Sequence, residues 1–169
     1  MTRRFLSAAV VGAVLAAAAV GAADDKPTPA DVLLREGKRL REAKDFDGAR
    51  EFFEAANTLA PKNPAVLVQL AWVYNEQKTH DLAAKTAQDA LKEAPANSDA
   101  LCELGYAHFK LKQYLKAITS LRKAVEKDDK NWTAYGYLAL ALRAVGEDEE
   151  AAEVEATRKK KMAPPPAPE

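Results

Sequence analysis

The sequence predicts an all-α fold, a solenoid of about four stacked helix-turn-helix units. Alanine, the strongest helix former, supplies 36 of the 169 residues. Glycine is sparse at 7 residues, and the aromatic content of 7% is low for a β-sandwich. A 34-residue period also runs through the chain. Periods of this length are typical of repeat proteins, in which each unit buries its apolar face against the next.

The period is visible as columns of equivalent residues. Small residues recur at Ala49, Ala83, Ala117 and Ala151. Further columns hold small residues (Gly37, Ala71, Gly105, Ala139), leucines (Leu33, Leu67, Leu101 and Leu70, Leu104, Leu138) and asparagines (Asn63, Asn97, Asn131). Helices that cross closely need Gly or Ala where their backbones approach, and bulky residues fill the spaces beside them. The small columns therefore predict the contacts between helices.

The first 23 residues have the three-part pattern of a secretory signal peptide. Arg3 and Arg4 give a positive start, residues 5–20 carry no charge, and small residues precede a cleavage site near Ala22 or Ala23. The uncharged stretch is short for a membrane span. We expect a periplasmic or secreted bacterial protein, with an uncleaved N-terminal anchor as the alternative. Removing Arg3 and Arg4 with this segment changes the formal net charge from 0 to −2.

The repeat units follow one another after a linker at residues 24–29. We place them at about residues 30–63, 64–97, 98–131 and 132–161. The second unit illustrates the pattern: Asn63 is an N-cap candidate, and Pro64 occupies the first helical position, where its missing N–H costs nothing. A polar turn then leads to a second helix from about His80 to Glu93, which Pro95 prevents from continuing.

These features resemble the tetratricopeptide repeat (TPR) family. The resemblance rests on the 34-residue period, on Leu70-Ala71-Tyr74 and Leu104-Gly105, on the alanine column and on the closing Pro61 and Pro95. It covers residues 30–161 and implies a right-handed α-solenoid that binds other proteins. Some family members clamp a C-terminal carboxylate with Lys and Asn residues. Lys38, Gln69, Trp72 and Glu103 do not reproduce that arrangement.

The fourth unit departs from the pattern in its second helix. Asp148 and Glu155 replace an aromatic and a large apolar residue, and the helix runs from acidic residues to a basic end. This charge order suits the helix dipole, and a polar outer face suits the cap of a solenoid. Residues 162–169 are rich in proline and are expected to form a disordered, polyproline-like tail, with a role as a groove ligand as the alternative.

Catalysis has almost no support in the residues present. The balanced charge argues against a nucleic-acid partner, and one cysteine excludes an intramolecular disulfide or a four-cysteine zinc site. His80 and His108 fall in different units, and no phosphate-binding loop or two-histidine metal helix is present. Cys102 is expected to be a small, partly buried residue, with a functional thiol as the alternative. We therefore expect no enzyme activity, no cofactor and no metal.

The remaining candidate function is recognition of another protein on the concave face, which is lined by the first helix of each pair. The register places four stripes there: Asp31, Leu34, Lys38 and Arg41; Ala65, Val68, Trp72 and Asn75 with Gln69; Asp99, Cys102, Tyr106 and Phe109; and Thr133, Gly136, Leu140 and Arg143 with Tyr137. Aromatic and arginine side chains dominate binding hot spots. The candidate partner-binding residues are Lys38, Arg41, Gln69, Trp72, Asn75, Tyr106, Phe109, Tyr137 and Arg143.

The sequence thus predicts a non-catalytic module that binds an extended peptide or a helix of a partner protein in its groove. We expect it to act as an exported scaffold or assembly factor. Two alternatives stay open. One is homotypic self-association through the same surfaces, and the other is a role as an accessory subunit of an envelope enzyme or export complex. No membrane contact is expected beyond the N-terminal anchor named above.

Overall fold

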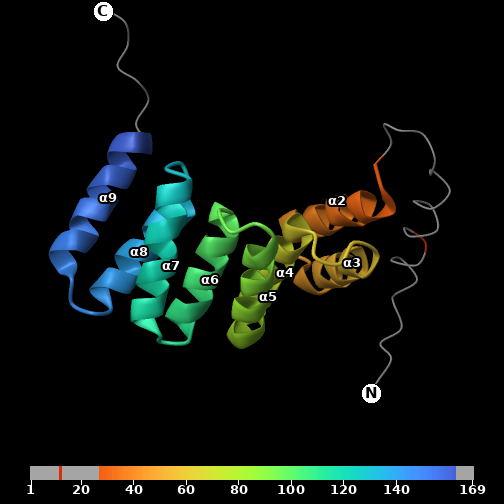
Figure 1. Ribbon diagram of the computed structural model, residues 1–169, viewed down its shortest axis with the longest axis horizontal. Coiled ribbons are helices and arrows are strands. Elements are labelled where there is room, and N and C mark those ends of the chain that lie inside the picture. Colours follow the sequence, from red (N-terminus) through yellow and green to blue (C-terminus); the bar gives the residue numbers. More distant parts are fainter. Residues whose placement is uncertain (1–11, 13–26, 163–169) are drawn as a thin grey trace, which may run out of the picture.

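The computed structural model describes residue 12 and residues 27–162, and this part of the chain contains helices and no strand. Its eight helices in residues 27–162 are α2 (Pro29–Glu42), α3 (Phe46–Leu59), α4 (Pro64–Glu76), α5 (His80–Glu93), α6 (Ser98–Lys110), α7 (Tyr114–Lys127), α8 (Trp132–Arg143) and α9 (Asp148–Met162). They form four pairs in a row, from α2 and α3 at one end to α8 and α9 at the other (Figure 1). The predicted all-α solenoid of four units is confirmed.

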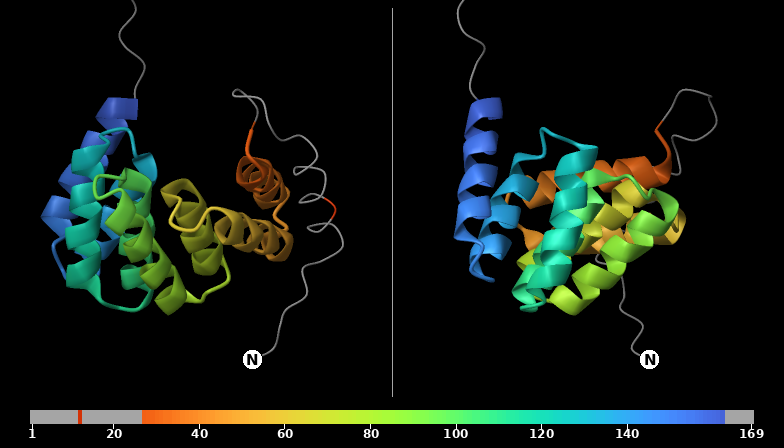
Figure 2. Two further views of the ribbon diagram at one scale, coloured as in Figure 1. Left: turned by 45° about the vertical axis from the view of Figure 1, so that its right-hand side comes forward. Right: turned by 60° about the vertical axis from the view of Figure 1, so that its left-hand side comes forward.

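The side views show the same row, with α9 outermost on the left of both panels (Figure 2). None of the helices in residues 27–162 is long and apolar enough to cross a bilayer. The predicted signal peptide, apart from Gly12, lies outside the described residues. So do residues 24–26 of the linker and the tail beyond Met162.

Asparagine side chains cap the N-terminus of the first helix in each of the last three units. The side-chain oxygens of Asn63, Asn97 and Asn131 accept hydrogen bonds of 3.0, 2.9 and 3.0 Å from backbone N–H groups two or three residues further on. These N–H groups have no partner within the helix, so the caps satisfy them. Thr28 caps α2 in a capping box with Asp31. The predicted N-cap role of Asn63 is confirmed.

The turn inside each helix pair repeats at the same 34-residue step. Its central residue has a positive φ in all four units: 61° at Lys44, 60° at Lys78, 60° at Lys112 and 87° at Gly146. The N–H of the following residue bonds back to a carbonyl five residues earlier, such as Thr79 to Tyr74 at 2.9 Å. This geometry ends the helix with a left-handed residue, which glycine adopts without strain and lysine does not. The reversal therefore depends on backbone hydrogen bonds more than on residue type.

The predicted small columns lie where helices touch. Ala49, Ala83, Ala117 and Ala151 are each 0% exposed. Gly37 faces Phe53, and a Cβ at position 37 would overlap the Phe53 ring. The ring leaves no room for a methyl group, so the glycine is required by the packing of α2 on α3.

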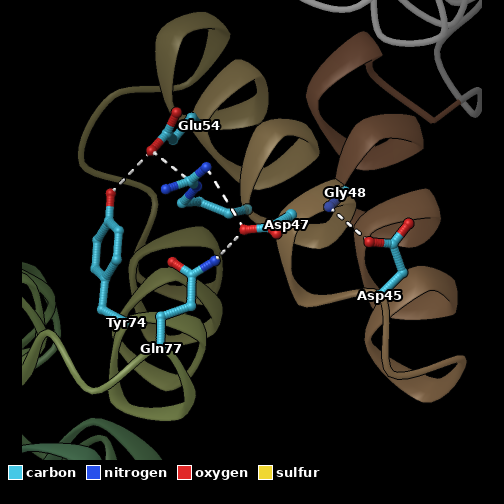
Figure 3. A network of polar contacts seen from close by, with 7 residues as sticks. Asp45, Asp47, Gly48, Glu54, Tyr74 and Gln77 are labelled. Atoms are coloured by element: carbon cyan, nitrogen blue, oxygen red, sulfur yellow. Dashed lines mark hydrogen bonds and ion pairs between the residues drawn. The ribbon is translucent and has the colours of Figure 1, made fainter.

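Polar contacts join α3 to α4 at the edge of the first unit (Figure 3). The Tyr74 hydroxyl donates to the Glu54 carboxylate at 3.2 Å, and the Gln77 amide donates to Asp47 at 2.8 Å. Arg50 lies between the two carboxylates, with guanidinium nitrogens 3.8 Å from Asp47 and 3.9 Å from Glu54. Such partly exposed pairs add little stability each. Their main effect is to orient one unit on the next.

Overpacking at the alanine column tests the register directly. Replacing Ala117 with leucine should destabilise the fold by roughly 1–3 kcal/mol, because the added methylenes have no space in a closely packed core. The melting temperature measured by circular dichroism should fall. An unchanged melting temperature would contradict the placement of Ala117 between helices.

Candidate peptide-binding groove

The first helices of the units enclose a cavity of about 200 Å³. It is lined by Arg41, Val68, Gln69, Trp72, Asp99, Cys102, Glu103, Asn131 and Thr133. These residues come from α2, α4, α6 and the start of α8, so the cavity crosses all four units. Of the nine candidate residues, Arg41, Gln69 and Trp72 line it. We call this hollow the groove cavity.

Arg41 bridges the first two units at one side of the groove cavity. Its guanidinium carbon lies 5.1 Å from the centre of the Trp72 ring, and Nη1 donates to Gln69 Oε1 at 2.7 Å. Phe46 packs edge-on against Trp72, with ring centres 5.5 Å apart. Cation–π contact and this hydrogen bond hold the guanidinium against the indole. A bound segment would therefore meet an ordered arginine and a partly exposed indole.

Asn75 is an internal residue rather than part of the lining. It is 3% exposed, and its amide nitrogen donates to the Glu103 backbone carbonyl at 3.1 Å and to Glu103 Oε2 at 2.8 Å. Its side-chain oxygen lies 3.2 Å from Nδ1 of His80. The sequence predicted that Asn75 lies on the concave face as a partner-binding residue, whereas its side chain is buried at the end of α4, in the interface with α6. Its polar atoms are occupied within the protein.

Glu103 is one of two acidic residues that line the groove cavity, the other being Asp99. Its pKa is raised to about 7, mainly by burial and to a smaller extent by the charges of Asp99 and Glu76, while the Asn75 hydrogen bond and Arg41 oppose the shift. Glu103 is missing from the predicted set. Its position was readable, because the 34-residue step places it between Gln69 and Tyr137 on the same face.

The aromatic candidates separate into distinct contacts. Tyr106 and Tyr137 stack with ring centres 4.4 Å apart, and His80 approaches Tyr106 edge-on at 6.2 Å. Phe109 packs against Tyr114, with ring centres 5.8 Å apart, and both Phe109 and Tyr137 pack against the core of the last two units. The Tyr106–Tyr137 pair thus joins the third unit to the fourth, while Phe109 supports the fold.

The charged candidates at the two ends lie outside the groove cavity. Lys38 is exposed on α2. Arg143 donates two hydrogen bonds, of 2.8 and 2.9 Å, to the Glu155 carboxylate of α9. This bidentate pair ties α8 to the last helix, so Arg143 has a partner inside the protein.

A second cavity, of about 390 Å³, lies between α8 and α9. It is lined by Trp132, Thr133, Gly136, Tyr137, Leu140, Glu155 and Arg158. Thr133 also lines the groove cavity, so the two hollows adjoin. We call this second hollow the end cavity. Sequence reasoning missed Arg158, because the last helix no longer follows the repeat columns.

The remaining chemistry of the described residues is sparse. No group of three His, Cys, Asp or Glu in residues 27–162 is arranged to hold a metal ion. Cys102 is free and 3% exposed, and burial raises its pKa well above the ordinary value. Because its pKa is raised, the Cys102 thiol stays protonated and weakly reactive. Burial also lowers the pKa of His80 and of His108.

Stacked helix pairs around a concave groove define a helical-repeat solenoid of the kind that presents a binding surface. Models of the tetratricopeptide repeat match residues 40–101 and 98–131. The chain belongs to the tetratricopeptide repeat family.

Two fungal relatives share this region. Small glutamine-rich tetratricopeptide repeat-containing protein 2 of Mycosarcoma maydis is 32% identical over 64% of this chain and 31% of its own length. The heat-shock protein cognate (HSC) co-chaperone sgt12 of Aspergillus fumigatus is 32% identical over 60% of this chain and 30% of its own length. The chain thus spans about a third of the length of these curated relatives.

Solved structures share the fold at lower identity. TTC0263, a thermophilic TPR protein of Thermus thermophilus, has a TM-score of 0.72 at 18% identity, covering 78% of this chain and 73% of its own. MamA of Desulfovibrio magneticus RS-1 has a TM-score of 0.68 at 23% identity, with 78% and 74% coverage. The first TPR of Spaghetti (RPAP3), bound to the HSP90 peptide SRMEEVD, has a TM-score of 0.65 at 22% identity, with 69% and 92% coverage. A domain of this fold therefore binds a peptide.

Proposed function

We propose that this chain is a non-catalytic interaction module, which binds an extended segment or a helix of a partner protein along its concave face. The groove and end cavities carry the proposal, because they share Thr133 and together are lined by residues from the first helices of all units. Trp72 and Tyr137 line it with aromatic surface, and Arg41 is ordered beside Trp72. Aromatic and arginine anchors in a concave site are the usual basis of peptide affinity.

The peptide-bound Spaghetti domain and the co-chaperone named among the relatives support the same general role. We further propose that the chain acts outside the cytoplasm as a scaffold or assembly factor. The signal-peptide pattern of residues 1–23 supports this part of the proposal. Cell fractionation, together with the mass of the mature chain and of its N-terminal peptide, tests this part of the proposal. A cytoplasmic chain that retains Arg3 and Arg4 would contradict export.

Truncating Trp72, which lines the groove cavity, together with Tyr106, which lines neither cavity but stacks on Tyr137 of the end cavity, tests the binding proposal. A Trp72→Ala, Tyr106→Ala double variant should lose partner binding, since hot-spot truncations cost about 2 kcal/mol or more each, or roughly 30-fold in affinity. Partners would first be identified by cross-linking in the native envelope fraction, and their affinity then measured with purified proteins.

Two controls separate binding from folding. Helical circular dichroism and the melting curve of the double variant show whether the solenoid persists after the loss of the Trp72 contacts. Leu115→Ala removes an apolar side chain that is 74% exposed and lies outside both cavities. That variant should bind as the wild type does. Full partner binding by a folded double variant would refute the groove assignment.

A further inference from the structure

Arg158 differs from the other arginines that lie near the concave face. Arg41 has Gln69 as a partner, and Arg143 has Glu155. Among the described residues, Arg158 has no hydrogen bond and no ion pair within 4.0 Å, although its side chain is half-buried. Its Nε–H is shielded from solvent and has no acceptor. A shielded donor without an acceptor costs free energy, so no hydrogen bond within the described residues stabilises this guanidinium.

Glu155 does not fill this role. It lies one helical turn before Arg158 on α9. Its pKa is lowered mainly by the hydrogen bond from Arg143 and to a smaller extent by the charge of Arg158. Both of its carboxylate oxygens, however, accept hydrogen bonds from Arg143, at 2.8 and 2.9 Å. The guanidinium N–H groups of Arg158 therefore have no acceptor among the described residues, and Arg158 lines the end cavity.

Gly136 provides an independent observation at the same place. A glycine inside a helix costs about 1 kcal/mol relative to alanine. At Gly105, close packing explains the glycine, because an added Cβ would lie 2.5 Å from Leu121 Cγ. At Gly136, an added Cβ would meet only Arg158, with Nη1 at 3.6 Å, which is an ordinary contact. The fold of the described residues therefore does not require this glycine, and its neighbour on this side is the Arg158 guanidinium.

We propose that the end cavity binds an Asp or Glu side chain of the partner segment, with its carboxylate paired to the Arg158 guanidinium and its backbone lying over Gly136. This inference rests on the proposed function, since the same segment would continue past Thr133 into the groove cavity. Trp132 and Leu140 offer apolar surface to a neighbouring side chain, and Leu140 is 46% exposed.

The charge pattern favours a carboxylate over a phosphate. A single guanidinium matches the single charge of a carboxylate and can donate two parallel hydrogen bonds to it. A phosphate dianion would also lie next to the Glu155 carboxylate, which lines the same cavity. A carboxylate therefore leaves less uncompensated negative charge in the cavity.

A positional-scanning library of extended peptides tests the proposal. Acetylated and amidated octapeptides, each with one fixed position, would be captured on the purified protein and counted by sequencing. The wild type should enrich Asp and Glu at one position, and Arg158→Gln should lower that enrichment about tenfold while apolar preferences remain. Lys160→Gln removes the same charge from an exposed site on α9 outside both cavities and should keep the enrichment.

The outcomes separate this inference from the proposed function. Peptide capture that depends on Trp72 and Tyr106, but shows no acid preference, would overturn the carboxylate site and leave groove binding intact. An acid preference that survives in Arg158→Gln would also overturn it. Failure of the wild type to retain any peptide would overturn both.

Side-chain NMR then locates the bound acid. The Arg158 Nε–H resonance should shift with the best acidic peptide of the library and not with its amide counterpart, Glu→Gln or Asp→Asn. Deleting residues 163–169 should leave this resonance unchanged in the free protein. A shift on that deletion would assign the end cavity to the chain's own tail and overturn the proposal.

Discussion

Replacing Leu121 with alanine should destabilise the protein by about 2–5 kcal/mol, one of the largest effects of any single truncation in this core. Leu121 is 0% exposed and belongs to the core cluster of the last two units. It lies over Gly105, and its Cγ would be 2.5 Å from a Cβ at that position. Truncation leaves a cavity there that the surrounding helices cannot close. Urea unfolding followed by circular dichroism measures the loss.

The companion change tests whether the two positions are complementary in size. Gly105→Ala should also destabilise, by roughly 1–3 kcal/mol, because the added methyl group collides with Leu121. Combining it with Leu121→Ala recreates the pair that the second unit already contains, Ala71 and Ala87, which are both 0% exposed. The double variant should therefore lose less than the sum of the single losses, by about 0.5–3 kcal/mol. Strictly additive losses would show that the two positions do not pack on each other.

This complementarity explains why the fold was readable from the sequence. Glycine at position 37 or 105 accompanies a large residue sixteen positions later, Phe53 or Leu121, and alanine at 71 accompanies Ala87. The columns record one packing contact repeated along the chain, so periodicity alone predicts it. The left-handed turn was not foreseen, because its column holds three lysines, and only Gly146 in the fourth unit carries the usual signal.

The candidate site was predicted less completely, for a geometric reason. The register within one unit identifies the concave face, and Arg41, Gln69 and Trp72 do line the groove cavity. Whether a polar side chain on that face is free depends on the helices packed around it. Asn75 is occupied by Glu103 of the next unit, 28 residues away, and Arg143 by Glu155, in the helix that departs from the repeat. The first contact depends on how units stack and the second on a helix outside the repeat pattern, and the pattern of one unit contains neither.

Replacing Glu103 with glutamine should stabilise the protein at pH 8, by an amount on the order of 1–3 kcal/mol. Burial raises the pKa of Glu103 to about 7 from an ordinary value of 4.5. Glutamine keeps an oxygen that can accept the hydrogen bond from the Asn75 amide, now 2.8 Å from Glu103 Oε2. The substitution therefore removes the cost of ionising a buried carboxyl group and retains its internal contact.

The sign of the pH dependence follows from the raised pKa. Between pH 4.5 and 7 the folded protein holds a proton on Glu103 that the unfolded chain has released. The stabilising contribution of that proton is fully present below pH 4.5 and is lost as the pH rises through 7. The histidines act in the opposite direction: the lowered pKa values of His80 and His108 make stability fall as the pH drops below 6.5. A single pH profile of the wild type would mix these contributions.

Comparing the wild type with Glu103→Gln at each pH cancels the histidine contributions, because both proteins contain them. Urea unfolding at pH 5, 6, 7 and 8 should give a stability difference that is smallest at pH 5 and grows in favour of the variant toward pH 8. Glu153→Gln, which neutralises an exposed carboxylate on α9, should show no such growth. A Glu103→Gln variant less stable than the wild type at pH 8 would mean that the folded protein favours the ionised carboxylate. If the gain is observed, the ionised Glu103 carboxylate in the wall of the groove cavity lowers the stability of the fold. The next measurement would then be whether this carboxylate interacts with a bound segment.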